Sequence, residues 1–205
     1  MTAGTAPATT DRSDFRHVLV SGTKVGVAIG AAVVVYLLVS RLVPPGLAQA
    51  LLQAVIVLAA AVAATLLPAH WTTARSTEGI AGAAAVGLWG TIVFMAIDVI
   101  VLRPLKAYPW TWDAIGGGST WWYLPIWWML GTFVAWLGGL VTAARARRGG
   151  NTAIFALALP LVLGAIGVGV GIGLSRGWSG IPIAAGAGFT ATLIVFAVIA
   201  ALRKG

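Results

Sequence analysis

The sequence contains no cysteine and few charged residues of either sign. Without cysteine, the 205-residue chain has no disulfide, no thiolate zinc site, no iron–sulfur ligands and no cysteine nucleophile. Charged residues make up only 9% of the chain, whereas about 25% is usual in a soluble domain. Because so few charges cannot cover a surface exposed to water, a soluble globular fold is excluded.

Apolar residues predominate in the sequence. They make up 60% of the chain, and the mean hydropathy is +0.97, which also excludes disorder over most of the length. A helix needs about 20 mostly apolar residues to cross the hydrocarbon core of a bilayer. Six stretches meet this requirement, and we place them at residues 22–43, 47–67, 79–102, 121–143, 152–174 and 181–202. The sequence therefore predicts an all-α fold, a polytopic integral membrane helical bundle with about six transmembrane helices.

The polar residues predict how the chain is organised around these spans. Residues 1–21 form a polar tail, and residues 22–205 form a single six-helix transmembrane domain with a Trp-rich outer segment at 103–128. With the N-terminus in the cytoplasm, nine Lys and Arg residues lie inside and four lie outside, as the positive-inside rule requires. We therefore expect a multi-pass protein of the cytoplasmic (inner, bacterial-type) membrane with both termini in the cytoplasm.

Tryptophan is the most conspicuous residue type, with ten copies. A belt at headgroup depth is the simplest interpretation of most of them. The alternatives are an aromatic-lined outer pocket and an anchor for another membrane subunit. Trp136 lies too deep for a belt, so we expect it to pack against a neighbouring helix or a bound lipid or pigment. The candidate ligand, lipid or partner contacts are Trp110, Trp112, Trp121, Trp122, Trp127, Trp128 and Trp136.

Asp98 and Arg103 form a candidate intramembrane charge site. An acidic side chain inside a span is a functional candidate by default. Asp98, however, lies near the outer end of its predicted span, close in sequence to Arg103 and Lys106. A local ion pair with one of these bases is the interpretation we favour. A proton or cation site, and coupling to a charge on a partner subunit, are the alternatives.

Glycines indicate helix packing in the fifth predicted span. Small residues four positions apart let two helix backbones approach closely in a membrane. The candidate packing positions are Gly164, Gly167, Gly169, Gly171 and Gly173.

Catalytic and metal-binding constellations are missing from the sequence. The two histidines, His17 and His70, fall on the cytoplasmic side, whereas Asp98 and Asp113 fall on the outer side. A Ser-His-Asp arrangement would therefore have to span the membrane. Two distant histidines with few carboxylates are also weak ligands for a transition metal. We predict no catalytic residue, no metal site and no enzymatic activity.

These features favour a non-catalytic integral membrane subunit that packs into and stabilises a larger membrane protein complex, with lipid or pigment contacts through an outer-face aromatic layer. Its partners would be membrane lipids and other integral membrane subunits. Nucleic acid is not expected, because the basic residues are scattered over short loops. No cofactor is predicted apart from a bound lipid or pigment. The alternative is a small-solute transporter or substrate-capture membrane protein with an aromatic outer pocket.

Overall fold

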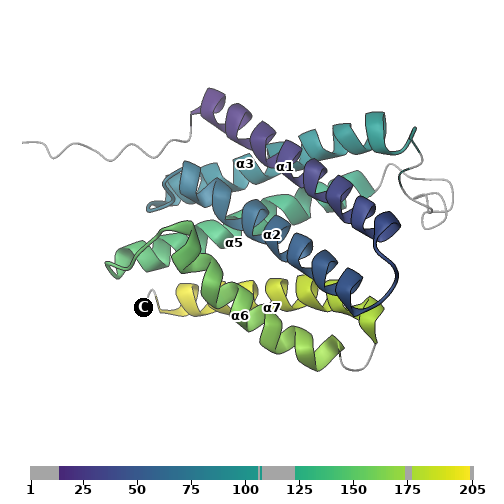
Figure 1. The fold of residues 1–205 in the computed structure, drawn as a ribbon. Coiled ribbons are helices and arrows are strands. Elements are labelled where there is room, and N and C mark those ends of the chain that lie inside the picture. Colours follow the sequence, from purple (N-terminus) through teal and green to yellow (C-terminus); the bar gives the residue numbers. More distant parts are fainter. Residues whose placement is uncertain (1–13, 106, 108–122, 174–176, 204–205) are drawn as a thin grey trace, which may run out of the picture.

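The computed structural model describes residues 14–105, 107, 123–173 and 177–203. These residues form six helices that are long and apolar enough to cross a membrane (Figure 1), and the described ranges contain no strand. The chain is a multi-pass helical membrane protein, as its composition predicts. Its elements in chain order are α1 (Phe15–Leu42), α2 (Leu47–Trp71), α3 (Thr77–Ile97), the π-helical turn η1 (Asp98–Leu102), α5 (Tyr123–Arg147), α6 (Ile154–Gly173), the 3-10 turn η3 (Trp178–Gly180) and α7 (Ile181–Leu202).

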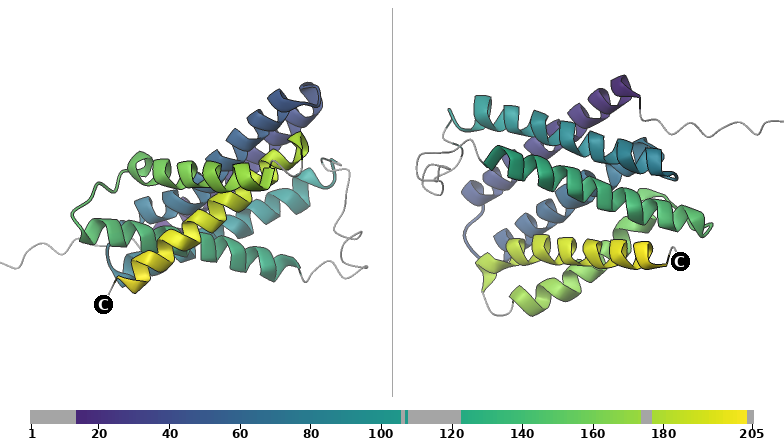
Figure 2. Two further views of the ribbon diagram at one scale, coloured as in Figure 1. Left: turned by 90° about the horizontal axis from the view of Figure 1, so that it is seen from below. Right: turned by 180° about the vertical axis from the view of Figure 1, so that it is seen from behind.

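Helix α2 occupies the middle of the bundle. It contacts α1, α3, α5, α6 and α7, whereas α1 packs mainly on α2 and α3, and α6 packs mainly on α7. The views in Figure 2 show α1 and α6 at opposite sides of the bundle. The main apolar core lies where α2, α5, α6 and α7 meet, and its buried residues include Leu66, Leu137, Leu161, Phe189 and Leu193.

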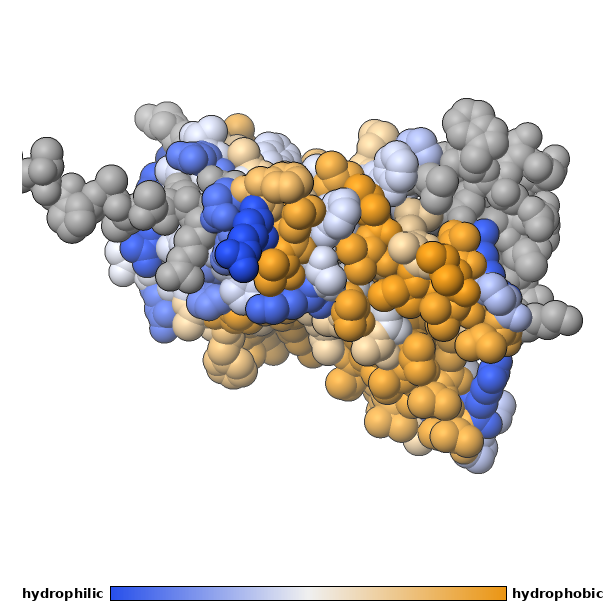
Figure 3. Space-filling model, turned by 90° about the horizontal axis from the view of Figure 1, so that it is seen from above, coloured by the Kyte–Doolittle hydropathy of each residue, from blue (hydrophilic) through white to orange (hydrophobic). Residues whose placement is uncertain are grey.

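The helices alternate in direction, so the bundle has two polar ends. We call the end where α1 begins and α7 ends the terminal face, and the end with the turns at 43–46 and 177–180 the hairpin face. Figure 3 shows hydrophilic residues gathered at these two ends and hydrophobic surface between them. This apolar zone is what a chain must present to lipid hydrocarbon.

Helices α1, α2 and α5 extend beyond their predicted spans, and α5 ends at Arg147 instead of residue 143. Helix α1 begins at Phe15 instead of residue 22, because Asp14 caps its first turn by accepting a hydrogen bond from the His17 N–H at 3.1 Å. Helix α2 continues through Pro68 to Trp71, although a proline is expected to end it. Close to a helix end Pro68 disrupts little, and its carbonyl oxygen still accepts from the Thr72 N–H at 3.0 Å.

Glycines bring α1, α3 and α5 into close contact. A Cβ added at Gly26 of α1 would lie 2.5 Å from the carbonyl oxygen of Gly90 on α3. A Cβ added at Gly87 would collide with Ala135 and with the Gly131 backbone of α5. These helix pairs therefore depend on the absence of side chains at their crossing points.

Candidate functional site

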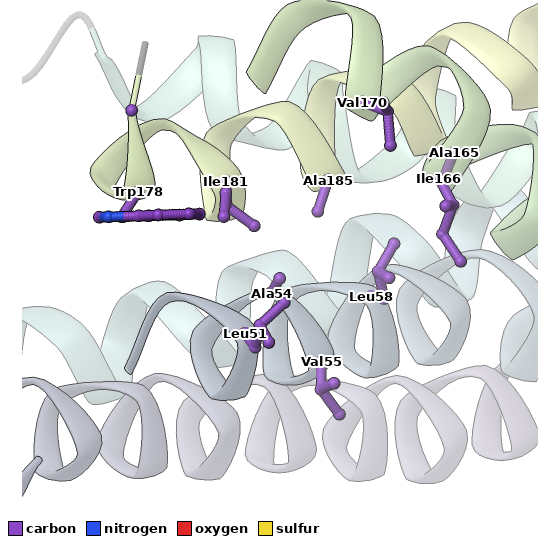
Figure 4. Close-up of a pocket in the computed structure, with 12 residues that line it drawn as sticks. Leu51, Ala54, Val55, Leu58, Ala165, Ile166, Val170, Trp178, Ile181 and Ala185 are labelled. Atoms are coloured by element: carbon purple, nitrogen blue, oxygen red, sulfur yellow. The ribbon is translucent and has the colours of Figure 1, made fainter. Parts of the chain in front are cut away.

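An apolar groove with a volume of about 650 Å³ lies between α2, α6 and α7. We call it the α2/α6/α7 groove. In the close-up of Figure 4, Trp178, Ile181 and Ala185 line one wall, Leu51, Ala54, Val55 and Leu58 of α2 line the wall opposite, and Ala165, Ile166 and Val170 of α6 line one end. Gly169 and Gly177 complete the lining.

The groove exists because α6 packs closely on α7 and only loosely on α2. A Cβ added at Gly188 of α7 would lie 2.5 Å from the Ala165 carbonyl oxygen of α6, so these two backbones almost touch. Between these two helices and α2, the facing residues include Ala54 of α2, Ala165 of α6 and Ala185 of α7, whose side chains are too short to fill the space. The result is a hydrophobic hollow in the membrane-spanning part of the molecule.

The chemistry of the α2/α6/α7 groove is limited to apolar contact. Its lining contains no ionisable side chain, so it has no group that could act as a general acid, a general base or a metal ligand. Trp178, which is 59% exposed, supplies the only polar side-chain atom in the lining, its indole N–H. Trp178 lies at the hairpin face, where an indole ring suits the membrane interface.

Asp98 and Arg103 form an ion pair within η1. The Arg103 Nε lies 3.0 Å from the Asp98 Oδ2, and Asp98 is only 6% exposed. Residues five apart point in different directions on an α-helix. The π-helical turn, closed by the Arg103 N–H donating to the Asp98 carbonyl oxygen at 2.9 Å, brings the two side chains to one side. The local pair favoured from the sequence is therefore present.

This ion pair stands where α3 leads into the Trp-rich segment. Four residues after Arg103, which is the C-cap of η1, the Ala107 carbonyl oxygen accepts a hydrogen bond from the Arg41 Nη2 of α1 at 3.3 Å. Arg41 and Arg103 are the two arginines that the structure describes at the hairpin face. Both therefore form contacts at the start of this segment. Trp110, Trp112, Trp121 and Trp122 lie outside the described residues.

The described tryptophans of α5 face outward. Trp128 is 37% exposed and Trp136 is 39% exposed, while Trp127 is half-buried. The ring of Trp136 lies 5.9 Å from that of Phe133, its neighbour on the same helix. Trp136 does not pack into the core of the bundle, because the inward side of α5 is taken by the smaller Ala135, Leu137 and Gly138. Its contact with a bound lipid or pigment stays a prediction.

Four of the five candidate glycines of α6 divide between two faces of the helix. Gly164 meets Thr192 of α7, and Gly169 meets the Ala184 backbone of α7. Gly167 and Gly171 face open space, with no described residue of another element within 4 Å of an added Cβ. Gly173 is the last residue of α6.

The histidines and carboxylates do not converge. The His17 Nε2 lies 3.0 Å from the Trp71 carbonyl oxygen at the terminal face, where it satisfies the end of α2. Asp98 is at the hairpin face, and no group of three or more His, Asp or Glu residues is found within the described ranges. Within the described residues, the fold therefore brings together no such group of potential metal ligands.

Buried hydroxyl groups do not form a polar chamber. Thr142 and Thr192 each donate to a carbonyl oxygen of their own helix, at 2.8 Å. Thr65 is fully buried, and its hydroxyl has no hydrogen-bond partner among the described residues. A solute carrier needs polar groups that converge at mid-depth, whereas the hydroxyls of Thr142 and Thr192 are each engaged by a carbonyl oxygen of their own helix.

Sequence reasoning overlooked Trp178 and the groove beside it. The groove depends on how far α2 stands from α6, and helical periodicity does not predict that distance. The glycine contacts of α1 with α3 were also overlooked, although Gly22, Gly26 and Gly30 are spaced four apart and could have indicated them. No protein-family model, no curated protein and no solved structure matches this chain.

Proposed function

We propose that this chain is a non-catalytic integral membrane subunit that packs into a larger membrane protein complex. In this proposal the chain lies in the cytoplasmic membrane with its terminal face inside, and its outward aromatic residues contact lipid. No catalytic group is assigned to it.

The outward face of α6 is the observation that carries the proposal. Helix glycines elsewhere in the bundle, such as Gly26 and Gly87, are used for contacts within the chain. Gly167 and Gly171 form the same four-residue spacing, but among the described residues no neighbouring helix lies within 4 Å of a Cβ added at either position. A glycine in a helix costs about 0.5–1 kcal/mol relative to alanine. A second helix that packs against this face would offset that cost.

The rest of the described surface supports a structural role. The bundle offers apolar helix faces and one apolar groove, and its one described ion pair lies at the hairpin face. An accessory subunit needs only such lipid-compatible surfaces and packing positions.

Photo-crosslinking in intact cells tests the proposal. A photoreactive residue at Leu163, one helical turn before Gly167 and 58% exposed, should give one discrete adduct with a different membrane protein. The G167L/G171L double variant should abolish this adduct without lowering the thermal stability of the purified chain, since both positions are open. The same probe at Met129, which is 71% exposed beside Trp128 and Phe133, should give lipid adducts.

Two results would contradict the proposal. If Leu163 yields only lipid adducts, α6 faces the bilayer and has no partner. If the adduct has twice the mass of the chain, the face joins two copies and no larger complex is needed.

The α2/α6/α7 groove favours a second candidate, a substrate-capture membrane protein for an apolar molecule. A volume of about 650 Å³ lies within the range of about 300–1,000 Å³ that is usual for small-molecule sites. A purified monomer that moves an apolar solute between liposomes would select this candidate over the subunit.

A further inference from the structure

A second, smaller pocket lies at the terminal face between the ends of α5 and α7. Its volume is about 360 Å³, and it is lined by Ala144, Arg147 and Arg148 from α5 and its end, and by Ala200 and Arg203 from α7 and its end. Ala144 and Ala200 are buried, while the three arginines are exposed. We call this site the three-arginine pocket. Figure 2 shows the end of α7 close to the end of α5.

The backbone around the pocket is held by hydrogen bonds. Helix α5 ends in a Schellman motif, in which the Gly149 N–H donates to the Ala146 carbonyl oxygen at 2.9 Å and the Gly150 N–H donates to the Arg145 carbonyl oxygen at 3.0 Å. Gly149 has φ of 66°, a conformation that a glycine adopts without strain. On the other side, the Arg203 N–H donates to the Ile199 carbonyl oxygen at 3.2 Å. Hydrogen bonds therefore fix the backbone on both sides of the pocket.

The pocket carries an excess of positive charge. Among the described residues, no carboxylate pairs with Arg147, Arg148 or Arg203. The carboxyl ends of two helices contribute about half a negative charge each, so about two positive charges remain uncompensated. Guanidinium groups bind the oxygens of carboxylates and phosphates through paired N–H donors. An anion with several oxygen atoms is the ligand that this arrangement suits.

The depth of the pocket points to a lipid as the source of that anion. Helix α7 carries no charged residue from Ile181 to Leu202, and Arg203 comes directly after it. The three arginines therefore lie where apolar spans leave the hydrocarbon, at the level of the phospholipid phosphates. The two alanines give the pocket an apolar inner side against which the glycerol and the first acyl carbons can lie.

We propose that the three-arginine pocket binds the phosphate group of an anionic phospholipid headgroup. The three guanidinium groups surround the phosphate, and the acyl chains run along α5 and α7 toward the hairpin face. One lipid binds per chain. This site is distinct from the α2/α6/α7 groove and does not depend on the function proposed above.

Native mass spectrometry of the detergent-purified full chain tests this inference. Phosphatidylglycerol should bind more tightly than phosphatidylcholine, with a first-site stoichiometry of one. The R147Q/R148Q/R203Q variant should bind phosphatidylglycerol about tenfold or more weakly, since each basic residue near anionic lipid contributes on the order of 1 kcal/mol. The R147K/R148K/R203K variant keeps the charge and the membrane insertion but loses the forked donors, so its affinity should fall between the two.

A matched control separates the pocket from the general charge of the terminal face. The R16Q/R75Q/R145Q variant removes the same number of exposed charges from that face and should keep the affinity within about twofold, because its changes lie outside the pocket. An equal loss in both variants would overturn the inference in favour of unspecific surface charge. Complete displacement of phosphatidylglycerol by millimolar inorganic phosphate would overturn the lipid assignment in favour of a free anion.

Discussion

At the scale of single residues, the described charges include a buried ion pair, Asp98 with Arg103, and a set of exposed cations at the terminal face. Asp98 is 6% exposed and bonds to Arg103 through both side chain and backbone. The exposed cations Arg147, Arg148 and Arg203 have no such partner within the described ranges. A buried pair holds a local structure in place, while unpaired cations at a surface are available to a ligand. We therefore assign stability to the first group and binding to the second.

Replacing Asp98 by Asn should lower the free energy of unfolding by about 1–3 kcal/mol, because the charge-assisted hydrogen bond between Asp98 and the half-buried Arg103 is lost. Thermal unfolding of the purified protein in detergent measures the change.

A double variant provides the control for Asp98. Since D98N/R103Q removes both charges, it should be more stable than D98N alone. If D98N is as stable as the wild type, the ion pair does not hold η1. If D98N folds normally but abolishes a transport activity, Asp98 is a functional carboxylate and the structural assignment is wrong.

The sequence predicted that Asp98 would pair locally, but it did not identify the geometry. Arg103 and Lys106 were both candidate partners, and an α-helix would have separated Asp98 from Arg103. The π-helical turn that joins them depends on one extra residue per turn. No residue type in Asp98–Leu102 signals such a turn, so it could be found only in three dimensions.

At the scale of helices, apolar length predicted the elements well and their contacts poorly. The six predicted spans correspond to α1, α2, α3 with η1, α5, α6 and α7. Within α6, spacing alone suggested two equivalent glycine pairs, whereas Gly164 and Gly169 face α7 and Gly167 and Gly171 face outward. Spacing identifies which residues share a face of a helix, but it does not say which helix that face meets.

The contact between α1 and α3 gives a sharp test of glycine packing. Replacing Gly26 by Ala should lower the free energy of unfolding by about 1–3 kcal/mol, since the new Cβ would lie 2.5 Å from the Gly90 carbonyl oxygen. Thermal unfolding in detergent again provides the measurement. Gly171→Ala is the matched control, and it should be neutral or stabilising by up to about 1 kcal/mol, because that position is open. Equal effects at the two positions would show that α1 and α3 do not approach as closely as described.

At the scale of the whole molecule, the composition predicted the class of protein, a helical membrane bundle. The candidate sites instead depend on how the helices are placed relative to one another. The scarcity of charge and the long apolar stretches were sufficient to predict a membrane bundle. The α2/α6/α7 groove and the three-arginine pocket are each built from residues more than 50 positions apart in the sequence. Such sites arise from the order in which helices pack, which a pattern of 3.6-residue periodicity does not contain.

The absence of cysteine makes the orientation of the bundle directly testable. In the described chain, basic residues gather at the terminal face, where α1, α5 and α7 carry Arg16, Arg147 and Arg203, so this face should lie in the cytoplasm. Single cysteines can be introduced at Thr77, at the start of α3 on the terminal face, and at Ser179, within η3 on the hairpin face; both residues are exposed. A membrane-impermeant maleimide should label S179C in intact cells and should label T77C only after the membrane is permeabilised.

If instead T77C is labelled in intact cells and S179C only after permeabilisation, the bundle has the opposite orientation, and the three-arginine pocket faces the outer leaflet. If both cysteines are labelled in intact cells, an even number of segments crosses between them instead of the three helices α3, α5 and α6, and the six-span arrangement itself is wrong.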